Sequence, residues 1–156
     1  MSTDFVDSLL ADIPAEEVVD KRIGTYPDAV FKTEVEVQAN EWEGKNIYSL
    51  TAKFDITDQD GNPAIVQQGI NIPDSEAPGW AKQALLQWLH AFELVDPSSK
   101  NTPIIPANGD EETKRGFVEK IAAAFNTRVG ATVPIVVYNS KKGFVNVRAG
   151  KPVKKA

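Results

Sequence analysis

Three segments of the chain alternate apolar and polar residues with a period of two. They are "AVFKTEVEVQA" (29–39), "IYSLTAKFDI" (47–56) and "AIVQQGINI" (64–72). This alternation is typical of β-strands with one buried and one solvated face. The connections "NEWEGKN" and "TDQDGNP" are short and rich in turn-forming residues. The pattern therefore predicts an antiparallel meander. The expected buried faces are Phe31, Thr33, Val35, Val37 and Ala39 in the first strand, Tyr48, Leu50, Ala52, Phe54 and Ile56 in the second, and Ala64, Val66, Ile70 and Ile72 in the third.

Two helices and two further strands are predicted after the meander. Helical periodicity covers residues 77–94 and 110–129, and strands are expected at 131–138 and 143–149 around the turn "NSKKG". Trp80, Trp88, Phe117 and Phe125 are expected to pack in the core. Five antiparallel strands with a two-helix insertion between strands three and four match the order of an OB-fold barrel, a mainly β, α+β architecture. An open α+β sandwich and a different small barrel are the alternative folds.

Charge is distributed unevenly along this chain of net charge -5. Residues 1–20 hold six acids and no base, whereas residues 140–156 hold six bases and no acid. We expect three regions: an acidic N-terminal segment (1–20) with a short helix at 3–12, an OB-fold domain (21–150) and a basic tail (151–156). A local basic patch can bind an anion despite a negative total charge. A solvated tail that aids solubility is the alternative.

The residue inventory gives little support for catalysis. There is no cysteine, and the one histidine, His90, falls among apolar residues of a predicted helix. Acidic clusters occur at turns and at a helix start, where acids are common in any case. We therefore predict no enzymatic activity, no metal site and no cofactor. No apolar run is long enough to span a bilayer and no basic leader precedes the first apolar residues, so we expect a cytoplasmic protein without a membrane partner.

The basic and aromatic residues of two loops favour nucleic-acid binding. In an OB-fold, strands two and three and the first and last hairpin loops form the ligand surface. Here those loops are "ANEWEGKN" and "NSKKG", and both combine lysine with a nearby aromatic residue. Single-stranded nucleic acid is bound by such mixtures, because bases stack on aromatic rings while cations follow the backbone. The candidate nucleic-acid-binding residues are Trp42, Lys45, Lys53, Lys141, Lys142, Phe144 and Arg148. Core positions for Trp42 and Phe144 remain equally open, and Tyr48 is expected in the core.

The chain resembles the small OB-fold single-stranded DNA-binding proteins of bacteriophages. The likeness lies in "IGTYPDAVF", "NEWEGKNIYSLTAKFDITDQDGNPAIV", the tryptophan-bearing helix and "RVGATVPIVVYNSKKGFVNVRAG", over about residues 22–150. It implies sequence-tolerant coating of single-stranded DNA in replication, recombination or repair, in the cytoplasm of an infected host cell. Many such proteins end in an acidic tail that recruits partners, whereas this chain ends in "GKPVKKA" and is acidic at its N-terminus.

The acidic N-terminal segment leaves a second hypothesis open. It would recruit a protein partner, or fold back over the basic site and compete with DNA. The alternative function is an acidic protein-interaction module, an inhibitor or adaptor of a host or phage enzyme, acting through residues 1–20 or a sheet edge. The choice between DNA and RNA, the partner's identity and the oligomeric state stay open, with a homodimer as one option.

Overall fold

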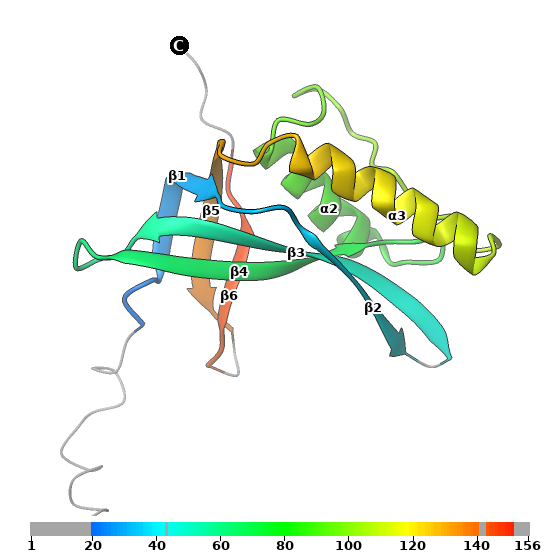
Figure 1. The fold of residues 1–156 in the computed structure, drawn as a ribbon, viewed down its shortest axis with the longest axis horizontal. Helices are drawn as coiled ribbons and strands as arrows, with labels where there is room; N and C mark the ends of the chain where they lie inside the picture. The colour runs from blue at the N-terminus through cyan, green and yellow to red at the C-terminus, as the bar shows by residue number, and fades with distance from the viewer. Residues whose placement is uncertain (1–19, 43, 141–142, 152–156) are drawn as a thin grey trace, which may run out of the picture.

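Over the residues that the structure describes, the fold is mixed α+β and mostly β, with one six-stranded antiparallel sheet and two helices. The structure, a computed structural model, describes residues 20–42, 44–140 and 143–151. Figure 1 shows both helices on the same side of the sheet. In chain order the elements are β1 (Gly24–Phe31), β2 (Glu36–Trp42), β3 (Lys45–Thr57), β4 (Pro63–Ile72), α2 (Gly79–Ala91), α3 (Glu111–Asn126), β5 (Thr132–Asn139) and β6 (Val145–Ala149).

The 13-residue strand β3 organises the sheet because it pairs with three other strands. Its first half pairs with β2, from Trp42 opposite Lys45 to Glu36 opposite Thr51. Its other edge pairs with β4 along ten residues. Near its end, β3 pairs with β1 through Phe54 opposite Phe31. The predicted antiparallel meander is confirmed as β2, β3 and β4.

The first predicted strand is in fact two strands, β1 and β2. At the end of β1, Phe31 is also held from the segment between α3 and β5: its N–H donates to Ala131 O (3.0 Å), and its carbonyl accepts from Gly130 N–H (2.8 Å). The N–H of Val35 donates to the Asn126 side chain at the end of α3 (2.8 Å). These contacts bend the chain between β1 and β2, so the sheet has six strands rather than the predicted five.

The predicted barrel closure is also wrong. The strand order is β2-β3-β1-β5-β6, with β4 on the other edge of β3. The two end strands β4 and β6 approach each other, but a side-chain bond replaces a backbone ladder there: Val147 N–H donates to Gln68 Oε1 (3.1 Å). The sheet is therefore not closed as a barrel. Because the first predicted strand divides, the two helices lie between β4 and β5 rather than between strands three and four.

An aromatic cluster joins the sheet to both helices. Phe92, directly after α2, makes edge contacts with Phe31 of β1 (ring centroids 4.9 Å apart) and Phe125 of α3 (4.7 Å). Trp88 of α2 stacks on Phe54 of β3 at 5.8 Å. All five predicted core residues of β3 are buried, Tyr48 included, as are Val66, Ile70 and Ile72 of β4. The helices therefore pack on the inner face of the sheet.

The β2–β3 hairpin extends beyond this core. Figure 1 shows it projecting away from β1, β5 and β6. Accordingly, Thr33, Val37 and Ala39 are exposed, although their alternation predicted burial; Val37 keeps 41% of its surface. The predicted helix at 3–12 and most of the predicted tail lie outside the described residues. Within the described ranges, no helix has the length and apolarity needed to cross a membrane.

Candidate nucleic-acid interface

The outer face of the β2–β3–β4 meander is mostly polar. Residues paired directly across antiparallel strands lie on the same face of a sheet, and Lys53 faces Gln67 here. Two further sets of paired residues run across β2, β3 and β4 in that order: Gln38, Ser49 and Asn71, and Glu36, Thr51 and Gly69. Gly69 leaves the sheet bare, because no heavy atom lies within 4 Å of where its Cβ would be. This face thus offers amide and hydroxyl groups beside an uncovered stretch of backbone.

A groove runs along the open seam between β4 and β6. It has a volume of about 260 Å³ and α2 forms part of its wall. Two exposed aromatic side chains line it, Trp80 of α2 with 74% of its surface accessible and Tyr138 of β5 with 39%. Arg148 of β6 also lines the groove and is exposed. The groove therefore combines two rings with a cation.

Trp80 also lines a second, larger hollow. This cleft has a volume of about 490 Å³ and lies at the end of β4, next to the start of β3. Asn71 and Ala81 line both the cleft and the groove, as Trp80 does. The two hollows thus adjoin each other at Trp80.

Beyond the end of the groove away from the cleft, the surface is basic. Arg148 and Lys151 together line two shallow depressions of about 450 and 280 Å³ beyond the groove. His90 lines the larger of them, and its Nε2 lies 2.9 Å from the Ser99 carbonyl oxygen. A phosphate in either depression would lie near two side chains that are cationic at neutral pH.

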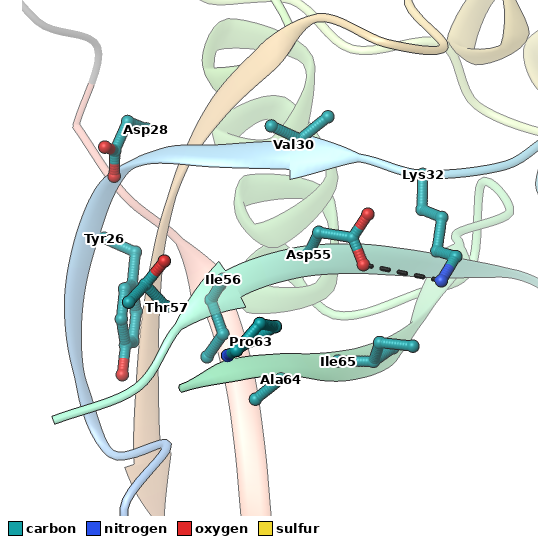
Figure 2. A pocket seen from close by; sticks show the side chains of 10 residues that line it. All are labelled: Tyr26, Asp28, Val30, Lys32, Asp55, Ile56, Thr57, Pro63, Ala64 and Ile65. Atoms are coloured by element: carbon teal, nitrogen blue, oxygen red, sulfur yellow. Dashed lines mark ion pairs between the residues drawn. The ribbon is translucent and has the colours of Figure 1, made fainter. Parts of the chain in front are cut away.

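A larger hollow, about 710 Å³, lies elsewhere, between β1, β3 and β4 (Figure 2). Figure 2 shows the side chains of Lys32 and Asp55 pointing toward each other, and their ion pair is 3.5 Å long. Asp28 also lines this hollow. Two carboxylates against one ammonium group make it unfavourable for a phosphate backbone, so size alone does not identify the site.

A hydrogen-bonded cluster fixes α3 beside the cleft. The buried Tyr48 hydroxyl donates to Glu111 Oε2 (2.6 Å), and Asn46 Nδ2 donates to the same oxygen (3.1 Å). The bond from Tyr48 is the main reason that the pKa of Glu111 falls below its ordinary value. The same hydrogen bond is the main cause that raises the pKa of Tyr48, and burial of the side chain is the second cause. The cluster holds the wall of the cleft in place.

The structure brings only part of the predicted site together. Arg148 lies in the groove, Lys53 is half-buried on the outer face of β3, and Phe144 is 67% exposed beside the β5–β6 turn. Trp42 and Lys45 pair through their backbones at the tip of the β2–β3 hairpin, but their side chains lie outside the described part of the structure. Lys141 and Lys142 lie outside the described residues altogether.

Sequence reasoning missed Trp80 and Tyr138. Trp80 was predicted in the core because Trp80, Ala84, Trp88 and Phe92 recur every fourth residue. However, four residues turn an α-helix by about 400°, so each step moves the side chain about 40° around the axis. Trp80 therefore points about 80° away from the buried Trp88. This rotation around the helix axis is the feature of the sequence that could have predicted the exposure of Trp80.

Comparison with known proteins identifies no family for this chain. No model of a protein family matches it, and a search of curated proteins finds no matching sequence. In the described part of the chain, no three His, Asp or Glu side chains gather in a group suited to a metal ion.

Proposed function

We propose that this protein binds single-stranded DNA, largely independently of sequence, along the path from the cleft through the groove to Arg148 and Lys151. The observation that carries the proposal is Trp80, a tryptophan with 74% of its surface exposed where the two hollows meet. An unpaired base can stack on such a ring for roughly 1–3 kcal/mol, and every base has a flat face. Tyr138 and Phe144 offer further exposed rings.

The strand arrangement supports an OB-type fold as part of this proposal. When β1 and β2 are counted as two halves of one bent strand, the sheet has five strands with helices between the third and fourth. An OB-fold is a partly open Greek-key barrel, and its second and third strands carry the ligand. In this protein those strands correspond to β3 and β4, whose outer face continues to the groove at Gly69 and Asn71.

The basic side chains favour one placement of a bound DNA strand. Arg148, Lys151 and Lys53 would contact phosphates. Lys45 begins β3, and in the sequence Lys141 and Lys142 follow β5. Duplex DNA hides the base faces that Trp80 needs, so single strands are preferred. Glu36 on the outer face opposes a phosphate backbone, which limits affinity. The resemblance to phage proteins adds the cellular role in this proposal, coating of DNA in replication, recombination or repair.

Fluorescence anisotropy of a labelled oligo-dT of about 30 nucleotides tests the proposal. We expect micromolar or tighter binding at low salt, a steep loss with added salt and weak binding of duplex DNA. Trp80→Ala should weaken binding by about fivefold or more. Val129→Ala removes an exposed apolar side chain away from the path and serves as the matched control. No binding at low salt, or equal effects of the two substitutions, would overturn the proposal.

The basic positions have their own test in the same assay. Arg148→Glu, and separately Lys141→Glu with Lys142→Glu, should weaken binding of every sequence and flatten the salt dependence. Unchanged affinity in both variants would remove the role assigned to these side chains.

A second candidate function is docking of a basic protein partner on the edge of β2. This strand ends the sheet order, and its described side chains, including Glu36 and Glu41, are exposed. An exposed edge can pair with an added strand. A basic, strand-forming peptide titrated into labelled protein should then shift the amides of β2 and leave the Trp80 indole signal unchanged. Shifts confined to Trp80 would exclude this candidate.

A further inference from the structure

The cleft beside Trp80 differs chemically from the rest of the path. Its walls are largely apolar, and Ile47, Ile72 and Pro78 line it together with Trp80. Its outer wall is held by the α2–α3 connection: buried Ile105 donates its N–H to Pro73 O (2.9 Å) and accepts from Ser75 N–H (3.1 Å). The cleft is therefore already formed without a ligand, which lowers the ordering cost of binding.

Charge indicates which part of a nucleotide would enter. The carboxylates of Asp74 and Glu76 line the cleft, and Lys114 is the one cation among its lining residues in the described chain. A phosphate inside would face net negative charge, whereas an uncharged base would not. The backbone would instead remain outside, toward Arg148 and Lys151. The occupant with matching chemistry is thus a flat, neutral heterocycle.

Polar groups at the cleft favour one base over another. Asn71 makes no side-chain hydrogen bond within the described residues, and its amide carries both a donor and an acceptor. An asparagine amide matches adenine, with its amino group and the adjacent ring nitrogen, through two hydrogen bonds.

We infer that the cleft between Trp80 and Asn71 is a base-selective subsite for one unpaired adenine within an otherwise sequence-tolerant interface. This inference rests on the proposed function. Stacking on Trp80 supplies sequence-tolerant attraction, and Asn71 supplies the discrimination. A strand bound along the path would place one base in the cleft while its neighbours cross the groove.

The test compares oligo-dT of 30 nucleotides with the same length of strand carrying a run of three adenines at its centre. We expect the adenine-containing strand to bind at least about fivefold more tightly. Asn71→Ala should bring the ratio of the two affinities close to one. Gln67→Ala is the matched control, because it removes an exposed amide from the same face of β4, four residues earlier. It should leave the ratio unchanged.

The outcomes separate this inference from the proposed function. Equal binding of both strands by the wild-type protein overturns the adenine subsite and leaves single-strand binding intact. A preference that survives Asn71→Ala overturns the role of Asn71 and with it the inference. Failure of both strands to bind overturns the proposed function and the subsite together. Adenosine alone, titrated while the indole resonance of Trp80 is observed, should shift that signal in the wild type and in Gln67→Ala, and more weakly in Asn71→Ala.

Discussion

Gly150, directly after β6, occupies a position without room for a side chain. A Cβ there would lie 2.9 Å from the carbonyl carbon of Pro134, and the Gly150 N–H donates to the Pro134 oxygen (2.8 Å). Gly150→Ala must therefore move one strand away from the other. We expect it to lower the free energy of unfolding by about 1–3 kcal/mol, measured by urea denaturation.

Gly69→Ala is the control for this prediction. The added methyl group at Gly69 meets no heavy atom within 4 Å, and the residue lies in the middle of β4. Alanine in a strand interior is favoured over glycine by roughly 0.5–1 kcal/mol, so stability should stay the same or rise. Similar losses in both variants would contradict the steric argument.

Single residues also mark the limit of what the sequence predicts about the site. Arg148 could be proposed from its charge and Phe144 from its place beside the last hairpin turn, and both prove exposed. Trp80 could not be assigned from spacing in whole turns, because its exposure depends on the drift around the helix and on where the sheet ends. Tyr138 is exposed for a different reason: Val133, Ile135 and Val137 of β5 are buried, so the alternation of the strand turns Tyr138 to the other face.

The first turn of helix α3 is attached to β3 through Glu111. Glu111 accepts hydrogen bonds from Tyr48 and Asn46, and its pKa therefore lies below the ordinary value of 4.5. A carboxyl whose pKa is lowered by folding stabilises the fold above its ordinary pKa, and this contribution is lost as the pH falls through the lowered value. The attachment of α3 should weaken in acid.

Tyr48→Phe tests this at the level of the element. The substitution removes the main cause of the lowered pKa, so the variant should lose less unfolding free energy than the wild type between pH 6 and pH 3. Hydrogen exchange in the first turn of α3 should report the same difference. An identical acid dependence in the two proteins would show that the contact contributes nothing.

Most helices and strands could be predicted from the sequence. The one strand that was predicted wrongly, at 29–39, shows what local patterns miss. Alternation located β3, β4, β5 and β6, because those strands have one face on the core. It also ran without interruption through the bend between β1 and β2, since Val35 is buried like any strand residue. The bend is made by partners about 90 residues away, Asn126 and Gly130, which no local pattern contains.

At the scale of the whole molecule, Phe92 connects the sheet to both helices. Its ring contacts Phe31, Phe54, Trp88 and Phe125, which come from two strands and two helices. Phe92→Ala should cost about 3–5 kcal/mol, and near-ultraviolet and far-ultraviolet circular dichroism should change in the same transition. Phe144→Ala, at an exposed position, should stay within about 0.5 kcal/mol of the wild type. Separate transitions for sheet and helices would show that the cluster does not unite them.

The net charge of the molecule bears on the proposed DNA binding. Residues 1–19 carry five acids and no base, so removing them takes the formal charge from -5 to 0 and leaves the Asp20–Arg22 ion pair in place. If this segment competes with DNA for the basic end of the path, its deletion should tighten oligo-dT binding by up to about tenfold at low salt. The gain should shrink as salt shortens the screening length to about 10 Å at 0.1 M. Replacing the five acids by their amides keeps the length of the segment and should give the same gain. Unchanged affinity in both variants would exclude competition and leave recruitment of a protein partner as the role to test for the acidic segment.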